Sequence, residues 1–241
     1  MSDDLFSKNI DKGDPIKIIE PTDVIGNIRF FNCDSRDFVK QVQSNFYNVG
    51  FYDPPYGIGM SKPAGNSQKY SRKKLKDNDW DNEAMSPGFF LQAQRIAADQ
   101  VIWGANHFAE NLPSPRNSKC WLIWDKREGF IPERTYADAE IAWASFDSPI
   151  RVFRFHWDGF LQKIKEKRIH PTQKPVSLYE WKLMKFCKEG DKIVDLFGGS
   201  FSVAIACYKQ GFALDIVERD PIIYADGLAR FKEHIQQGTL F

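Results

Sequence analysis

Short apolar runs alternate with amphipathic stretches along most of the chain, and this alternation sets the expected order of elements. Apolar runs bounded by Gly, Pro, Asn or Asp are typical of strands; they occupy residues 27–32, 49–52, 100–103, 120–124, 139–143, 150–157, 193–197 and 213–217. Amphipathic stretches with capping residues predict helices at residues 35–42, 86–98, 175–186, 202–210 and from 221 onward. Strands that alternate with helices predict an α/β domain with a largely parallel sheet.

We expect a single domain over residues 1–241, because this length suits one large domain and the sequence shows no internal repeat. The first dozen residues are polar, which predicts a loosely ordered end. Residues 58–80 are polar, basic and contain glycine, so we expect a long loop there. Loops of that length without regular structure are uncommon and tend to be lids or binding segments.

Asp53, Pro54, Pro55 and Tyr56 directly follow the apolar run 49–52. In an open α/β sheet, ligands bind at the carboxyl ends of the strands. The two prolines keep the backbone extended and remove two N–H donors, which leaves carbonyl oxygens and the Asp53 carboxylate as acceptors. Such a pocket, with a tyrosine ring beside it, suits an amino group on a planar ring. These four residues are the predicted catalytic residues, and a proline-stiffened turn is the alternative.

A second strand end carries a glycine turn, in which Gly198, Gly199 and Ser200 follow the run 193–197. Glycine allows the backbone to approach a ligand closely. Glu218 lies at the end of the next strand, 19 residues beyond Gly199. An acidic residue at that distance binds ribose hydroxyls in nucleoside-binding crossovers, although a solvated glutamate is the alternative. The turn lacks the Gly-x-Gly-x-x-Gly spacing of a NAD-type dehydrogenase.

The net charge of +1 does not by itself indicate a partner, but the basic residues are clustered. One cluster lies at residues 69–76 within the predicted loop and the other at residues 163–174. Arginines also alternate with apolar residues on the strand-like run before the second cluster. The residues that we predict to contact phosphate are Lys69, Arg72, Lys73, Arg151, Arg154 and Arg168. A solvated charged face is the alternative.

The four cysteines are far apart and form no Cys-x-x-Cys pair, so the sequence predicts neither a metal site nor a disulfide framework. No stretch approaches the roughly 18 apolar residues of a membrane span. The acidic, polar N-terminus does not resemble a signal peptide. We therefore expect a reduced cytoplasmic protein.

In chain order, these motifs resemble the β class of DNA amino-methyltransferases, in the compact form of phage and prophage enzymes. That class has an Asp-Pro-Pro-Tyr motif, then His-Pro-Thr-Gln-Lys-Pro, then the glycine turn of the methyl-donor site. Here these are residues 53–56, 170–175 and 195–200, and Asn32-Cys33-Asp34 matches the turn ahead of the first motif. The resemblance implies a Rossmann-like doubly wound sheet with a permuted motif order. It also implies a small inserted target-recognition segment, which we place at residues 146–169.

The resemblance further implies that methyl passes from S-adenosylmethionine to the N6 amino group of adenine in double-stranded DNA, after the base is flipped. Asp53 and the Pro54 carbonyl would accept hydrogen bonds from that amino group, and Tyr56 would stack on the base. The residues expected to hold the methyl donor are Asp34 at its adenine, Glu218 at its ribose, Asp195, Phe197, Gly199 and Ser200 around its methionine part, and Thr172 and Lys174 near its carboxylate.

Several alternatives remain open at this point. The family usually has Gly-Ser-Gly-Thr where this chain has Gly199-Ser200-Phe201-Ser202, and the phenylalanine would block the donor unless it points into the core. A catalytically silent DNA-binding relative is therefore one alternative. The N4 amino group of cytosine is another, although the family more often places Ser at position 53 for that substrate. Enzymes that methylate protein glutamine usually have Asn-Pro-Pro-Tyr and lack the 170–175 segment. A homodimer and a restriction endonuclease partner are both left open.

Overall fold

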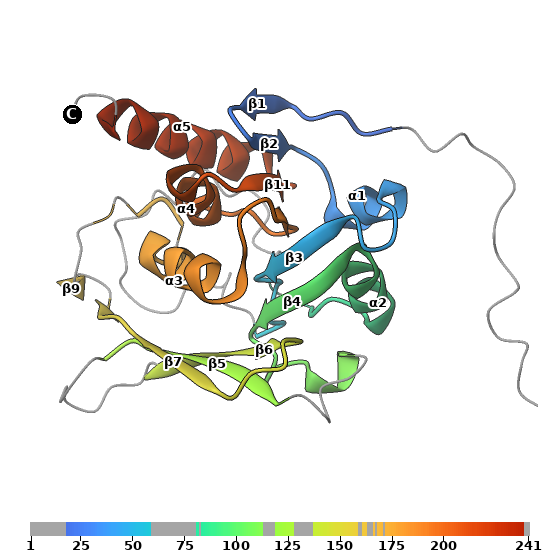
Figure 1. Ribbon diagram of the computed structural model, residues 1–241, viewed down its shortest axis with the longest axis vertical. Helices are drawn as coiled ribbons and strands as arrows, with labels where there is room; N and C mark the ends of the chain where they lie inside the picture. The colour runs from blue at the N-terminus through green and yellow to red at the C-terminus, as the bar shows by residue number, and fades with distance from the viewer. Residues whose placement is uncertain are drawn as a thin grey trace, which may run out of the picture.

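The computed structural model describes residues 18–58, 81, 83–112, 119–127, 137–158, 161–162, 166, 168–170 and 172–238. One nine-stranded sheet has the order β1-β2-β11-β10-β3-β4-β6-β5-β7, and β8 and β9 form a separate ribbon (Figure 1). The strands are β1 Asp23–Ile25, β2 Ile28–Phe31, β3 Tyr47–Tyr52, β4 Ala97–Trp103, β5 Cys120–Asp125, β6 Ala139–Ala144, β7 Arg151–Arg154, β8 Trp157–Asp158, β9 Leu161–Gln162, β10 Lys192–Asp195 and β11 Ala213–Val217. The helices are α1 Ser35–Gln41, α2 Pro87–Ile96, α3 Val176–Phe186, α4 Ser202–Gln210 and α5 Pro221–Gly238, with a 3₁₀ turn η1 Ala109–Asn111.

The centre of the sheet is parallel, and its flanks mix parallel and antiparallel pairs. β2, β11, β10, β3 and β4 pair in parallel, whereas β6 is antiparallel to both β4 and β5, and β1 is antiparallel to β2. β5 and β7 pair in parallel again, so the prediction of a largely parallel sheet is confirmed, with β1 and β6 as the antiparallel strands. Antiparallel neighbours need no crossover helix, and the sequence has no amphipathic helical stretch between the runs 120–124 and 139–143.

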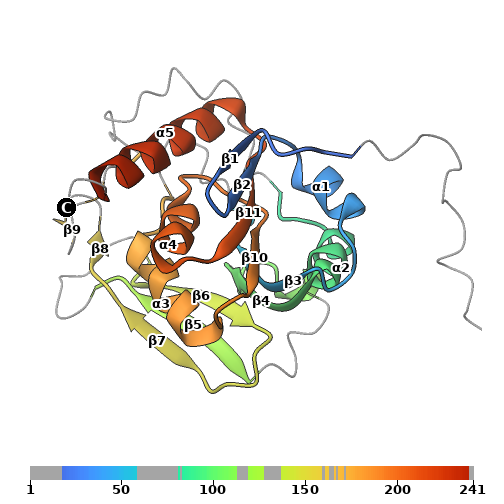
Figure 2. The same cartoon turned by 45° about the horizontal axis from the view of Figure 1, so that its top comes forward.

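Helices cover both faces of the sheet, so it is doubly wound as predicted (Figure 2). α1 and α2 pack on one face, where Phe38 and Phe90 belong to one buried cluster. α3, α4 and α5 pack on the other, where Leu183, Ile205 and Phe231 belong to a second cluster. Among the described residues, no helix combines the length and apolarity that a membrane crossing requires.

Helix ends lie where capping residues predict them. Ser86 caps α2 by accepting a hydrogen bond from the Phe89 N–H at 3.3 Å, and Pro87 takes the first helical position. Gly211 ends α4 in the left-handed conformation with φ 77°, which glycine adopts without steric cost. The predicted limits of α4 and β11 are confirmed.

Several predicted boundaries differ from the observed ones, among them the start of β4 at Ala97 and the end of β10 at Asp195. α2 ends at Ile96 rather than at residue 98, because Ala97 already pairs with Tyr47 in the sheet. The strand predicted over residues 150–157 is divided into β7 and β8, and the Trp157 indole N–H donates to the Gln173 carbonyl at 2.9 Å, which draws the chain away from the sheet edge. β1 has no counterpart among the predictions, since three residues are too few to show a period. Apart from residue 58, the predicted loop lies outside the described residues.

Candidate active site

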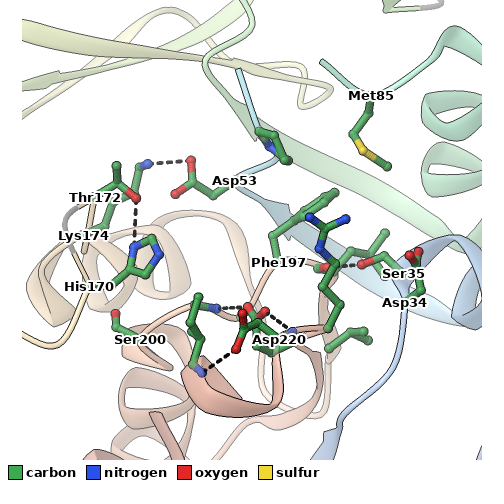
Figure 3. Close-up of a pocket in the computed structure, with 18 of the residues that line it drawn as sticks. Asp34, Ser35, Asp53, Met85, His170, Thr172, Lys174, Phe197, Ser200 and Asp220 are labelled. Atoms are coloured by element: carbon green, nitrogen blue, oxygen red, sulfur yellow. Dashed lines mark hydrogen bonds and ion pairs between the residues drawn. The ribbon is translucent and has the colours of Figure 1, made fainter. Parts of the chain in front are cut away.

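The predicted motifs meet at one edge of the parallel centre. β2, β11, β10 and β3 are neighbours and parallel, so their carboxyl ends face the same side, where α/β sheets bind ligands. A pocket of about 950 Å³ opens there (Figure 3). The predicted site residues that line it are Asp34, Asp53, Pro55, Thr172, Lys174, Phe197, Gly199, Ser200 and Glu218. The structure therefore brings the amino-acceptor motif and the glycine turn to a single cavity.

The glycine turn after β10 is held by Glu218. One oxygen of this carboxylate accepts the Gly199 N–H at 2.9 Å and the other accepts the Asp220 N–H at 2.8 Å. Burial raises the pKa of Glu218 above its ordinary value, against the effect of those two N–H donors. Glu218 thus fixes the shape of the turn that faces the pocket, and its contact with a ribose stays a prediction.

Phe201 does not block the pocket. Its ring is fully buried and packs against Phe30 at 5.2 Å and Tyr224 at 5.6 Å between ring centroids. Its backbone has φ 58°, in the left-handed region that favours glycine. Because the side chain points into the core, the backbone alone does what a glycine would do in this turn. The departure from the family pattern leaves the cavity open.

Asp195 stands behind the turn rather than in the pocket. It is buried, does not line the cavity, and accepts the Phe197 N–H at 2.8 Å. Burial raises the pKa of its carboxyl group. Asp34, by contrast, lines the cavity while it caps α1, accepting the Arg36 N–H at 2.8 Å and pairing with the Arg36 guanidinium at 2.6 Å. Contacts of both residues with a bound molecule stay predictions.

Asp53 lies at the centre of a buried polar network. Its Oδ1 atom contacts the Lys174 ammonium at 2.6 Å and accepts the Tyr56 hydroxyl at 2.9 Å. Within the described residues, Oδ2 accepts no hydrogen bond. Lys174 also contacts Glu140 at 3.1 Å, and Glu140 pairs with Lys126 at 2.5 Å. Lys174 was predicted to approach the carboxylate of a bound methyl donor, but its ammonium faces Asp53.

The charges of this network follow from its pairing. Burial alone would lower the pKa of Lys174, but Asp53 and Glu140 outweigh it and raise that pKa. Burial alone would raise the pKa of Glu140, but Lys174 and Lys126 outweigh it and lower that pKa to about 2. The network therefore keeps both groups ionised.

Tyr56 is fixed from several sides. Its N–H and that of Gly57 donate to the buried Asp81 carboxylate at 2.7 and 3.0 Å. Its ring stacks on the exposed His107 ring, with centroids 5.2 Å apart and planes at 17°. A side chain at Gly104 would collide with it, since a Cβ there would lie 2.2 Å from the tyrosine ring. The predicted stacking on a flipped base is not tested by these contacts.

His170 and Thr172 of the 170–175 segment line the pocket, whereas the predicted phosphate contacts on β7 and at position 168 do not. Thr172 is within hydrogen-bond distance of the His170 ring at 3.0 Å, and burial lowers the pKa of His170 to about 4. On β7, Arg154 is exposed and lies 3.6 Å from Asp125, whereas Arg151 is half-buried. The Arg168 guanidinium lies 5.9 Å from the Trp157 ring centroid. Lys69, Arg72 and Lys73 lie outside the described residues.

Sequence reasoning missed Glu140, Lys126 and Asp81. Glu140 gave one signal, because it is a carboxylate inside the apolar run 139–143 and so had to find a partner when that strand was buried. Lys126 and Asp81 gave no signal, since each stands among other polar residues.

Comparison with known proteins shows the protein family to which the chain is related. The DNA methylase family of N6 and N4 enzymes matches residues 67–216, which is more than half of the chain. Type II methyltransferase M2.MboI of Moraxella bovis is 25% identical over 218 residues, covering 75% of this chain and 78% of its own. Type II methyltransferase M.HpaI of Haemophilus parainfluenzae is 22% identical over 216 residues, covering 74% and 67%.

Solved structures show the same fold. The PvuII DNA methyltransferase (cytosine-N4-specific) superposes with a TM-score of 0.59 at 12% identity, over 90% of this chain and 93% of its own. The M1.HpyAVI–SAM complex gives 0.53 at 18%, over 84% and 99%. Fold and pocket thus define a methyltransferase-type α/β protein. The chain belongs to the N6/N4 DNA methylase family, which confirms the prediction of a DNA methyltransferase that uses S-adenosylmethionine.

Proposed function

We propose that this protein methylates the N6 amino group of adenine in double-stranded DNA, with the N4 amino group of cytosine as the alternative. The observation that carries the proposal is the Asp53 carboxylate, which lines the pocket with Oδ2 left over as an acceptor. Fold similarity does not favour either base, because one superposed structure is cytosine-N4-specific by its name. Adenine is favoured by the resemblance alone, since the family more often has Ser at position 53 for cytosine.

The pocket fits the methyl donor that the family uses. Its volume of about 950 Å³ lies within the usual range for cofactor sites. A Cβ built on Gly199 meets nothing closer than the Phe197 carbonyl at 4.0 Å, so the backbone faces open space there. Asp34, Glu218 and the turn at Phe197–Ser200 would hold the donor. When bound, S-adenosylmethionine supplies an electrophilic methyl group on its sulfonium.

The residues of the chain have to orient the amino group, because its lone pair is conjugated with the ring. A hydrogen bond from one amino hydrogen to Asp53 Oδ2, and one from the other to the Pro54 carbonyl, would draw the nitrogen toward tetrahedral geometry. Such positioning supplies most of the rate in a direct displacement. The amino nitrogen sheds one proton on methylation, and Oδ2 is the atom placed to accept it. The base must leave the duplex first, which costs a few kcal/mol.

We further propose that six basic residues contact DNA phosphates: Arg151, Arg154, Arg168, Lys69, Arg72 and Lys73. Residues 146–169 would recognise the target sequence. The exposed Arg154 on the edge strand β7 supports this. A permuted motif order, a phage-type role and a cytoplasmic location remain parts of the same proposal.

The test is transfer of labelled methyl from S-adenosylmethionine to unmethylated duplex DNA, with the product digested to nucleosides. We expect N6-methyladenine from the wild type and a loss of about a hundredfold or more in Asp53→Asn, the scale for removing one positioned polar group. Asp215→Asn is the matched control, because Asp215 is a buried aspartate outside the pocket. N4-methylcytosine would select the alternative base. No transfer and no thermal shift with the donor would indicate the silent relative.

A further inference from the structure

Glu140 is a half-buried carboxylate that belongs to none of the sequence motifs. It lies on β6, outside the parallel centre of the sheet, and its side chain is 23% exposed. One oxygen pairs with Lys126 at 2.5 Å, and the other faces the Lys174 ammonium at 3.1 Å. Glu140 thus brings a carboxylate from the antiparallel strand β6 into the polar network around Asp53.

Lys174 has no hydrogen-bond donor to spare. An ammonium group has three N–H donors, and Lys174 has three oxygen partners: Asp53 Oδ1 at 2.6 Å, Glu140 at 3.1 Å and the Tyr56 hydroxyl at 3.2 Å. Rotation about the Cδ–Cε bond of the lysine would move the ammonium nitrogen away from all three oxygens together. Oδ1 of Asp53 is therefore held in place, and Oδ2 is the oxygen left for a molecule in the pocket that Asp53 lines.

Glu140 also competes with Asp53 for the electrostatic attraction of the Lys174 ammonium. With Asp53 as its only anionic partner, a buried ammonium would be attracted to that carboxylate alone and would weaken it as an acceptor. With Glu140 opposite, the ammonium is shared between two anions, and Lys126 balances the extra negative charge. Asp53 then keeps both its orientation and most of its negative charge.

We propose that Glu140 is a positioning residue for methyl transfer, which acts through Lys174 to hold and tune Asp53. The inference rests on the proposed function, because it concerns the acceptor of the amino group. It predicts an effect on the rate of methylation at saturating substrate rather than on the binding of the donor, since Glu140 does not line the pocket.

Glu140→Gln tests the inference, because glutamine keeps the size and removes the charge. Rates are expressed per donor-binding site, counted by binding of S-adenosylmethionine, so that unfolded protein does not enter the comparison. We expect kcat to fall about tenfold or more, while the KM for S-adenosylmethionine stays within about twofold. Asp215→Asn, which removes a buried paired carboxylate elsewhere, should lower the melting temperature without that loss of kcat.

A double-mutant cycle with Lys174→Met separates action through Lys174 from a general effect. If Glu140 acts through Lys174, adding Glu140→Gln to Lys174→Met should change kcat by no more than about twofold. If the losses of kcat in the two single variants multiply in the double variant, the inference is overturned. A wild-type kcat in Glu140→Gln would overturn it as well. Both outcomes would leave the proposed function standing. Absence of DNA methylation by the wild type would overturn both.

Discussion

Lys174 and Lys182 lie eight residues apart, and each buries its ammonium 5.5 Å from the centroid of the Trp103 ring. The two ammonium groups differ in their oxygen partners. Lys174 contacts the oxygens of Asp53, Glu140 and Tyr56. Lys182 makes no hydrogen bond within the described residues, and its ammonium lies over the rings of Tyr179 at 3.9 Å and Phe51 at 4.5 Å.

The two lysines show that oxygen partners, and not burial, decide whether a buried amine is charged. The pKa of Lys174 is raised because its carboxylates outweigh the cost of burial. The pKa of Lys182 is lowered because burial dominates. Aromatic faces stabilise a desolvated cation by about 2 kcal/mol, whereas burying an ion costs several kcal/mol. The rings around Lys182 therefore cannot replace the missing oxygens, and burial lowers the pKa of its amine to about 7.

The largest expected effect comes from removing the paired lysine. Lys174→Met leaves Asp53 and Glu140 as buried carboxylates without their shared cation, so the free energy of unfolding should fall by about 3–5 kcal/mol. Methyl transfer should fall by about 10²–10³-fold. Urea unfolding and the methylation assay measure both. Lys209→Met removes an ion pair whose lysine is 46% exposed and should cost at most about 1 kcal/mol. Equal stability of Lys174→Met and wild type would contradict the comparison.

Removing the unpaired lysine should have the opposite sign. Lys182→Met keeps the length of the side chain and deletes an amine without a hydrogen bond, so the free energy of unfolding should rise by about 1–4 kcal/mol. Lys182→Gln is the control, because it leaves a polar group in the same apolar surroundings and should bring no such gain. A loss of stability in Lys182→Met would show that the ammonium has a stabilising partner.

The smallest effect is a pH dependence that should distinguish the two sites. Because the folded-state pKa of Lys182 lies below its ordinary value of 10.5, the unfolded chain binds more protons between those two values. Its stability contribution therefore improves as pH rises through that window, with a slope of at most about 1.4 kcal/mol per pH unit. Urea unfolding at about pH 8 and about pH 10 should show the wild type approaching Lys182→Met. The difference between wild type and Lys174→Met should not shrink there, since the pKa of Lys174 is raised.

Sequence reasoning succeeded where a single residue type determines the local structure around it. Ser86 and Pro87 begin α2, Gly211 ends α4, and the strand ends bring Asp53 and Gly199 to one pocket. These features depend on neighbours in the chain or on the general rule that parallel strands end at one edge.

Sequence reasoning could not reach partners that lie far along the chain. Nothing local to Lys174 indicates that its ammonium meets Asp53 and Glu140, because the sequence does not show that the strand 139–143 pairs with β4. Contact of Lys174 with a donor carboxylate stays a prediction. The 3.6-residue period of α3 likewise does not reveal that Lys182 is fully buried.

Phe201 also constrains how this sequence can change. Its ring fills the space in front of α5, where a Cβ on Gly227 would lie 3.0 Å from both that ring and the Gly199 carbonyl. A glycine within a helix costs about 1 kcal/mol relative to alanine, so α5 carries this cost in order to admit the ring. The two positions are therefore linked: a side chain at 227 requires both a smaller side chain at 201 and a shift of the Gly199 carbonyl. The substitution at 201 therefore has to precede the one at 227.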